Sequence, residues 1–406
     1  MLNLKIAWRN ITRQINRSAI TISIIGIGLA FFIWLWALDD GFNNQLVNNA
    51  TGYYFGHLQV SAAGFYPEYN PKFSIAEPAR IGRILMNDKK VKSVSPRIEA
   101  PVFLSSATRA KGTVLIGIDP ENEAKVTSFP HRIKAGKYLV QRDPQSIIIG
   151  KIIAEELGVE VGDKIVVTAA AADGTMAQEA FRVKGLIDTG IQNLDSVLAC
   201  VSLSSAQAML GLKNKTTSFV IKLHDQGKLG QMERELKKKL GKEGFYVRSW
   251  QEIMPALSDA IGFFKSVMLI ILSTVFTVMA VGTANTVMIS VIERTRELGL
   301  TMALGTSGRQ VVIMVVWETI LLGILGIILG NGLGLALILI TQRTGIDLSR
   351  FNMKVIPGAM SIVYPDIVVP HLLEASLLLL LLTVIISIFP AMRAVRLKPA
   401  EAIRFI

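Results

Sequence analysis

The sequence is poor in cysteine and in charged residues. Cys200 is the single cysteine in 406 residues, which excludes a disulfide framework and a zinc site built on several cysteines. Charged residues make up 18% of the chain, against roughly 25% in soluble domains, and hydrophobic residues make up 51%. The 43 Lys and Arg outnumber the 31 Asp and Glu, giving a net charge of +12. This basic, apolar composition argues against nucleic-acid binding and is typical of a membrane protein.

The sequence also lacks a recognisable catalytic or metal-binding pattern. None of the four histidines stands three or four residues from another histidine or from the cysteine; they are His57, His131, His224 and His371. Gly150-Lys151 lacks the rest of a phosphate-binding loop, and no G-x-S-x-G or H-E-x-x-H occurs. We therefore expect no catalytic residue, metal or cofactor in this chain, and we expect any energy source to lie in another subunit.

Long runs without charge predict four membrane spans. No charged residue stands between Arg17 and Asp39 or between Lys265 and Glu293. Two later runs are interrupted only by Glu318 and Glu374. Each run is long enough to cross a hydrocarbon core of ~30 Å, which takes about 20 residues. We place the spans at 18–38, 261–292, 310–341 and 367–392, and we interpret the first as a retained anchor because no typical signal-peptidase site precedes Asp39.

The distribution of positive charge sets the orientation of these spans. Lys and Arg gather in the short segments 1–17, 293–309 and 393–406. Because basic segments next to spans stay in the cytoplasm, both termini and 293–309 are expected there. The long segment 39–260 and the loop 342–366 are then expected outside.

Segment 39–260 has the mixed polarity of a folded domain and is long enough to bury its own core. Alternating or continuous apolar patterns predict strands at 57–60, 111–116, 147–149, 181–184 and 197–201. Helical periodicity predicts helices at 77–87, 151–157, 204–210 and 227–240. We expect an α+β domain in two lobes. The fold class is thus a membrane protein with four transmembrane helices and this large domain between helices 1 and 2.

Residues 1–17 predict an amphipathic helix that lies in the inner-leaflet interface before the first span. Apolar side chains recur at helical spacing on one side, at Leu4, Trp8, Ile11 and Ile15. Basic side chains recur on another side, at Lys5, Arg9, Arg13 and Arg17. The same basic residues also serve to set topology, and the two roles are compatible.

The segment 293–309 predicts a rigid helical knob beyond the second span. Alternating charges stand at 293–297, and a short helix follows at 298–304. Such a knob suits a socket on a cytosolic partner, with charges fixing its register and Leu298 and Met302 supplying apolar contact. The alternative is a solvated loop with topogenic arginines, and residue physics alone favours neither.

Two motifs resemble a known family. The pattern S-V-x-E-R-T-R-E-L-G-x-x-x-A-L-G at 290–305 resembles the coupling-helix segment of MacB/FtsX-like ABC transporter permeases. The pattern P-A-x-R-A-x-R-x-x-P-A-E-A-I-R at 390–404 resembles the C-terminal signature of that family. The order of one span, a large outer domain and three more spans also matches, so the resemblance covers the whole chain.

Three further elements resemble the lipoprotein-releasing (LolC/LolE-type) branch of this family. They are Asp40-Gly41-Phe42 with Leu46, the element Gly117-Ile-Asp-Pro120, and the glycine-rich stretch 149–164. One departure concerns the hairpin at 169–180. The chaperone-contacting subunit of that branch carries a proline-containing hook there, whereas this chain has Asp173-Gly174 and no proline.

The resemblance implies a dimer of permeases, alike or paralogous, on two ATPase subunits that bind ATP and Mg. The residues implied in ATPase coupling are Glu293, Arg294, Thr295, Arg296, Glu297, Leu298 and Met302. The residues implied in an acyl-chain cleft are Phe31, Phe32, Trp34, Trp36, Phe42, Phe263, Phe264, Met268, Phe276 and Met279, although aromatic residues near a membrane interface are more often lipid anchors. Gly326, Gly330 and Gly334 have the small-xxx-small spacing of helix packing. Glu318 is a functional candidate, and we favour for it the structural role of pairing with arginines of the amphipathic helix at 1–17.

Three functions remain open at this stage. The first is a permease that extracts lipoproteins or another amphiphile from the outer leaflet of the bacterial inner membrane, with a periplasmic chaperone or adaptor as a further partner. The second is a MacB-like mechanotransmission subunit for efflux or an FtsX-like regulator of periplasmic enzymes. The third is a membrane-anchored enzyme, which the lack of a catalytic pattern disfavours.

Overall fold

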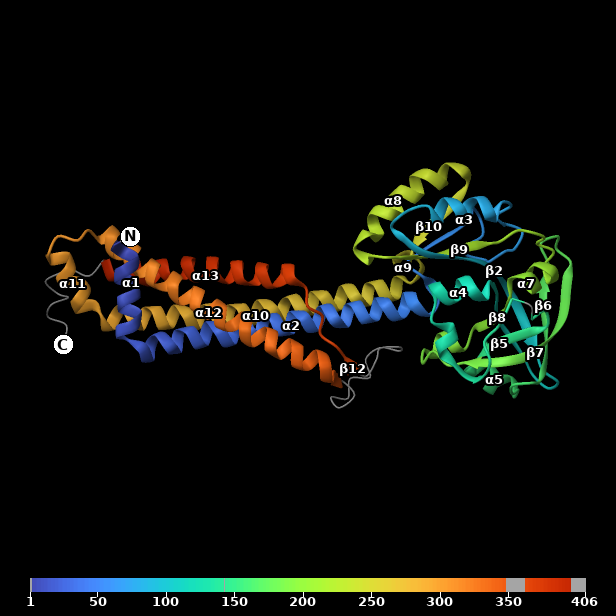
Figure 1. Ribbon diagram of the computed structural model, residues 1–406, viewed down its shortest axis with the longest axis horizontal. Coiled ribbons are helices and arrows are strands. Elements are labelled where there is room, and N and C mark those ends of the chain that lie inside the picture. Colours follow the sequence, from blue (N-terminus) through green and yellow to red (C-terminus); the bar gives the residue numbers. More distant parts are fainter. Residues whose placement is uncertain (1, 142, 348–361, 396–406) are drawn as a thin grey trace. The chain divides into compact units, whose positions relative to one another are not determined.

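The computed structural model describes residues 2–141, 143–347 and 362–395 (Figure 1). The described residues form two compact units. Leu46–Asp259 forms a globular unit, and the described residues outside it form a helical unit. The predicted loop 342–366 and tail 393–406 lie partly outside the described residues, at 348–361 and 396–406.

The helical unit is built from four long apolar helices and two short ones. The short helices are α1 (Leu2–Arg13) and α11 (Thr295–Ala303). The long helices are α2 (Ile15–Ala50), α10 (Pro255–Glu293), α12 (Gly308–Thr344) and α13 (Val369–Val395). Each long helix is apolar and long enough to cross a membrane, and together they are the four candidate spans among the described residues.

Two of these helices extend well beyond the predicted spans. α2 continues past residue 38 through the polar stretch 39–50 and ends in the π-helical turn Thr51–Phe55. α10 begins at Pro255, before the predicted start at 261. Hydropathy marks only where a helix is apolar, whereas helical hydrogen bonding also continues through polar residues, so both helices are longer than the apolar runs they contain.

The N-terminal helix α1 packs against α12. Ile11 is buried, whereas Trp8 and Ile15 of the predicted apolar side are exposed. The chain turns at Gln14, and the hydroxyl of Ser18 donates to the carbonyl of Ile11 across this turn at 3.0 Å. The side chains of Leu4 and Lys5 lie outside the described part of the structure.

Helix α12 packs closely on α2 through glycines. Gly326, Gly330 and Gly334 are buried, and a Cβ added at any of them would collide with Ile25, Leu29 or Ile33 of α2. The missing side chains thus let the two helix backbones approach each other. α13 packs along α12 on the same unit.

The connection between α11 and α12 is sharply defined. Gly305 ends α11 with a φ of +99°, a conformation that residues with a side chain rarely adopt. Ser307 then caps α12 with a reciprocal pair of hydrogen bonds to Gln310. The 293–309 segment is therefore a short folded knob rather than an extended loop.

The globular unit contains a ten-stranded mixed sheet in the order β10-β1-β9-β2-β3-β8-β5-β7-β4, with β6 pairing with β2 and β7. The strands are β1 (Leu58–Ala62), β2 (Val91–Ser105), β3 (Ala110–Ile118), β4 (Ile133–Gly136), β5 (Ser146–Gly150), β6 (Lys164–Ala170), β7 (Met176–Ile187), β8 (Leu198–Ser202), β9 (Ser218–Leu223) and β10 (Phe245–Ser249). The pairs β3–β8 and β5–β7 are parallel and the other pairs are antiparallel. The predicted α+β class is confirmed, as are the five predicted strands.

Seven helices accompany this sheet among the described residues. They are α3 (Pro78–Met86), α4 (Pro120–Val126), α5 (Lys151–Leu157), α6 (Gln192–Asp195), α7 (Leu203–Met209), α8 (Leu229–Leu240) and α9 (Trp250–Ile253). The core divides into one cluster around Leu104 and Phe181 and another around Phe129 and Ile148. A single sheet nevertheless runs through the unit, so the division into two lobes stays a prediction. A second, two-stranded sheet, β11 (Ile346–Asp347) with β12 (Ile362–Val363), belongs to the helical unit.

Candidate functional site

A cluster of charged side chains gathers where α1, α2, α10, α11 and α12 meet. We call Asn10, Arg17, Arg294 and Glu318 the Glu318 cluster. Arg294 Nη1 donates to Glu318 Oε2 at 2.8 Å, and Arg17 Nη2 donates to Glu318 Oε1 at 3.3 Å. The Asn10 amide donates to Glu318 Oε2 at 3.5 Å. The expected pairing of Glu318 with arginines is thus present, and it includes an arginine of the knob.

This cluster is shielded from its surroundings. The side chain of Glu318 is 7% exposed and that of Arg294 is 11% exposed. Glu293 and Glu297 also pair with Arg17 and Arg294, but both of these acids are 57% exposed. Solvent-exposed ion pairs contribute little to stability. The buried contacts of Glu318 are therefore the main interactions of this cluster.

The knob presents two different faces. Leu298 is buried, and with Met302 it packs among Val291, Val311 and Ala391. Thr295 is also buried and donates its hydroxyl to the carbonyl of Val291. The expectation that Leu298 and Met302 supply an exposed apolar contact therefore needs correction, because both side chains face the bundle.

The outward face carries other residues. Arg296 and Glu297 are exposed, as are Leu300 and Leu304, the latter at 80%. The sequence patterns did not single out Leu300 and Leu304 as contact residues, although both lie at helical spacing on the face opposite Leu298. The exposed outward face of the knob therefore consists of Arg296, Glu297, Leu300 and Leu304.

The predicted cleft residues fall into two groups. Phe32 and Met279 are buried in the bundle core, where Phe32 contacts Trp36 and Phe276 at centroid distances of 5.6 and 5.8 Å. Phe42 contacts Phe264 at 5.7 Å, and Phe264 contacts Phe263. These residues, with the half-buried Met268, form an aromatic seam between α2 and α10.

Phe31 and Trp34 lie elsewhere. Their rings contact each other at 5.8 Å, and the Trp34 indole donates to the hydroxyl of Thr341 on α12 at 3.2 Å. Trp34 is therefore held against α12 rather than in the seam. The helical repeat explains this, since residues two apart on a helix point in different directions.

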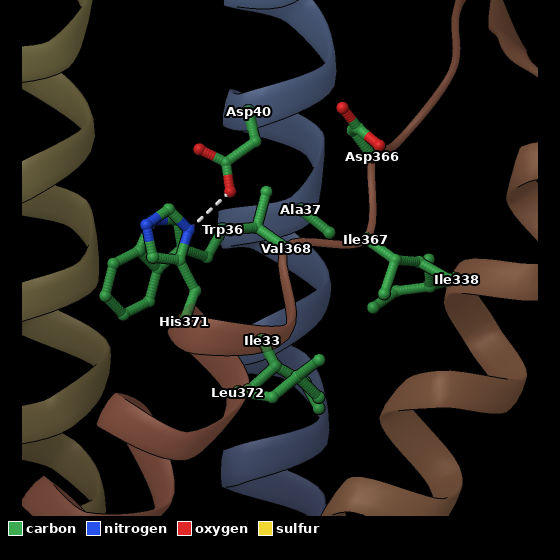
Figure 2. A pocket seen from close by; sticks show the side chains of 10 residues that line it. All are labelled: Ile33, Trp36, Ala37, Asp40, Ile338, Asp366, Ile367, Val368, His371 and Leu372. Carbon is green, nitrogen blue, oxygen red and sulfur yellow. Dashed lines mark hydrogen bonds and ion pairs between the residues drawn. The ribbon is translucent and has the colours of Figure 1, made fainter. Parts of the chain in front are cut away.

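A second polar cluster ties α13 to α2 (Figure 2). His371 Nδ1 lies 2.6 Å from Asp40 Oδ2, and the His371 ring stacks on Trp36 at 4.4 Å. The backbone N–H of Asp366 donates to the carbonyl of Ala37 at 2.9 Å. The space between these side chains is a cavity of about 10 Å³, about what one water molecule needs.

The globular unit holds a buried ion pair. Arg97 and Glu123 are both fully buried, with Arg97 Nη2 at 2.5 Å from Glu123 Oε1. Burial alone would lower the pKa of Arg97, but the Glu123 carboxylate raises it above the usual arginine value. Glu99 lies nearby and accepts hydrogen bonds from Tyr54, Tyr66 and Ser218. Both carboxylates of this network, Glu99 and Glu123, accept hydrogen bonds, so we interpret the network as a structural part of the core.

The histidines and the cysteine of the globular unit show no catalytic arrangement. His57 Nδ1 accepts from the backbone N–H of Leu223 at 2.9 Å, and burial lowers its pKa to about 4. Burial raises the pKa of the Cys200 thiol, which opposes a nucleophilic role. Within the described residues no group of His, Cys, Asp and Glu is arranged to hold a metal ion.

Four candidate spans, a large α/β domain inserted between the first two and a folded knob between the second and third define a multi-pass membrane protein of the permease class. Residues 18–239 match the MacB-like periplasmic core domain, and residues 268–399 match the FtsX-like permease C-terminal domain. The chain therefore belongs to the MacB/FtsX-like family of ABC transporter permeases. It is an inner-membrane protein, and its globular unit is the MacB-like periplasmic domain.

Individual relatives cover nearly the whole chain. The lipoprotein-releasing system transmembrane protein LolC of Xylella fastidiosa is 27% identical over 94% of this chain and 93% of that protein. LolE of the same system in Haemophilus influenzae is 22% identical over 94% of this chain and 93% of that protein. The macrolide export ATP-binding/permease protein MacB of Bdellovibrio bacteriovorus is 21% identical over 96% of this chain and 59% of that protein.

Proposed function

We propose that this chain is the permease subunit of an ABC transporter that extracts lipoproteins, or another lipid-like amphiphile, from the outer leaflet of the inner membrane. The observation that carries the proposal is the similarity to LolC and LolE proteins along 94% of the chain, through both the periplasmic domain and the membrane helices. In this proposal ATP and Mg bind to two copies of a separate cytoplasmic ATPase, and both termini of the permease are cytoplasmic.

The outward face of the knob supports the ATPase partner. Arg296 and Glu297 can form ion pairs with a cytosolic subunit, while Leu300 and Leu304 would lose solvent contact on docking. Two exposed leucines beside exposed charged residues are what we expect of a small docking surface.

The aromatic seam between α2 and α10 supports the amphiphilic cargo. α10 is the least covered of the long helices, with only 11% of its most apolar window buried within the chain. Phe263 is 65% exposed at the edge of the seam. A second permease subunit, alike or paralogous, and acyl chains would complete this surface, because aromatic and methionine side chains adapt to flexible chains.

Photo-crosslinking tests the cargo directly. A photoreactive phenylalanine analogue at Phe264 or Met268 probes the seam, and the same analogue at Leu377, an exposed residue of α13, serves as the matched control. We expect lipoprotein to be labelled from the seam and not from Leu377, with loss of the adduct during ATP turnover. Labelling of phospholipid alone from all three positions would refute lipoprotein extraction.

The MacB similarity over 96% of the chain favours one second candidate, a mechanotransmission subunit for efflux. In that case the seam holds no cargo, and the globular unit works through periplasmic proteins. Crosslinks from the globular unit to a periplasmic adaptor, without lipoprotein adducts from the seam, would support this candidate instead.

A further inference from the structure

The arginines of the knob motif do not share one role. Arg294 and Arg296 stand two residues apart, yet Arg294 is turned inward to the Glu318 cluster while Arg296 is exposed. Arg294 lies at the junction between α10 and α11, which end and begin at Glu293 and Thr295. Whatever holds Arg294 therefore holds the base of the knob.

The same carboxylate holds the start of α2. Arg17 is the third residue of that helix and binds Glu318 Oε1, while Arg294 binds Glu318 Oε2. Asn10 adds a contact from α1. One side chain of α12 thus joins the amphipathic helix, the first span and the knob.

Charge balance makes Glu318 the necessary member of this cluster. Arg17 and Arg294 would repel each other in a site from which solvent is largely excluded, and Glu318 is the buried acid between them. The exposed acids Glu293 and Glu297 are screened by water and cannot replace it.

The cluster is too tightly packed to be a ligand site. The adjoining cavity is about 20 Å³, and besides Arg17, Arg294 and Glu318 it is lined by apolar side chains and by the hydroxyl residues Thr21, Thr286, Ser290 and Thr319. That volume accommodates a single water molecule. The small cavity and the contacts of Glu318 with two other helices favour a mechanical role.

Resting on the proposed function, we infer that Glu318 is the positioning residue that transmits movement of the knob to α2 as well as to α10. Because α10 continues directly into the knob, an ATPase that moves α11 moves α10 with it. Through Arg294, Glu318 and Arg17 the same movement reaches α2. The two helices of the aromatic seam are then driven together in each ATPase cycle.

The test compares Glu318→Gln with the wild-type chain, both reconstituted in liposomes with the ATPase that copurifies with the wild type. Gln keeps the size of the side chain and removes its charge. We expect complex assembly and ATP hydrolysis to change less than twofold. Transfer of a fluorescent triacylated lipopeptide to soluble albumin, per ATP hydrolysed, falls roughly tenfold, within the range of measured coupling between sites.

A structural readout accompanies the transport assay. Spin labels at Thr12 of α1 and Thr301 of α11, both exposed, report the distance between α1 and the knob. In the wild type this distance stays fixed when ATP and vanadate trap the ATPase, and in E318Q it changes or broadens. Glu318→Asp retains the charge and is expected to restore part of the transport per ATP.

Glu374→Gln is the matched control, since Glu374 is an exposed glutamate on another membrane helix, α13. It should leave both readouts unchanged. Wild-type transport per ATP in E318Q overturns this inference and leaves the proposed function standing. If the wild-type chain binds no ATPase, the proposed function fails and the inference fails with it. If E318Q does not reach the membrane, Arg294→Gln takes its place. This variant removes the opposite charge, and we expect the same loss of transport per ATP.

Discussion

His371 of α13 lies 2.6 Å from Asp40 of α2, and its ring stacks on Trp36 one turn earlier in the same helix. The chain just before α13 also binds the following turn of α2, since Gln45 donates to the carbonyl of Tyr364 at 3.0 Å. Asn44 donates to the carboxylate of Asp366 at 2.8 Å. The C-terminal half of α2 and the N-terminal end of α13 are therefore fastened to each other within the helical unit.

Gly41 makes this fastening possible, so Gly41→Ala should loosen it. A Cβ at Gly41 would collide with the backbone of Tyr364 and Pro365, and relieving such overpacking costs about 1–3 kcal/mol. We expect a lower melting temperature in detergent and faster hydrogen exchange at the start of α13. Gly262→Ala, where a Cβ meets open space, is the control. Equal melting temperatures for the two variants would contradict this account of the D-G-F motif.

The knob supplies a second prediction, which concerns binding of the ATPase. Arg296→Glu should weaken ATPase binding several-fold at low salt and less at high salt, because an exposed charge contributes about 0.2–1 kcal/mol that salt screens. Leu304→Ala should weaken binding equally at both salt concentrations, since apolar burial is not screened. Arg294→Gln should leave binding unchanged. Titration of labelled ATPase against the detergent-solubilised chain measures all three, and a strong binding defect in Arg294→Gln would contradict the division of roles.

The sequence did not predict which face of the knob helix is buried against the bundle. The charged motif left a helical knob and a solvated loop open, and the structure contains the knob. Leu298 and Met302 lie on one helical face and Leu300 and Leu304 on another. Periodicity separates these faces but does not tell which of them meets the bundle, because that depends on how α10 and α12 pack around α11.

In the globular unit, the sequence predicted several strands of the sheet but not the burial of its charged residues. Alternating apolar patterns located β3 and β7, and continuous apolar runs located β5 and β8, since each strand buries one or both faces in the core. The stretch Arg97-Ile98-Glu99 alternates charged and apolar residues as a half-exposed strand does, yet all three are buried. α4, which carries Glu123, packs against β2 and covers the charged face. Such a contact between distant segments leaves no periodic signal.

The pair Arg97–Glu123 predicts a large stability effect. Glu123→Gln leaves the Arg97 guanidinium buried without its anion, which costs about 3–5 kcal/mol of unfolding free energy in comparable pairs. Replacing both residues together, as Arg97→Met with Glu123→Leu, should cost less than Glu123→Gln, because neither charge of the pair remains buried without the other. Lys134→Gln, which breaks the exposed pair with Asp188, should cost under about 1 kcal/mol. Hydrogen exchange of the β2 and β9 peptides measures these free energies, and a mild effect of Glu123→Gln would show that the ion pair is not needed.

His57 predicts how the stability of the globular unit depends on pH. Burial, with Lys222 nearby, lowers its pKa to about 4 in the folded chain, against about 6.5 when unfolded. A lowered folded-state pKa contributes stability that is complete above pH ~6.5 and is lost as the pH falls toward ~4, because the unfolded chain binds the proton first. The loss amounts to about 3 kcal/mol over this window. Gln does not titrate in this range, so the His57→Gln chain should lose about 3 kcal/mol less stability than the wild type between pH 6.5 and 4. Hydrogen exchange of β1 and β9 at the two pH values measures this difference. An equally steep decline in both chains would assign the acid sensitivity to other groups, since the carboxylates also titrate near the lower end of this range.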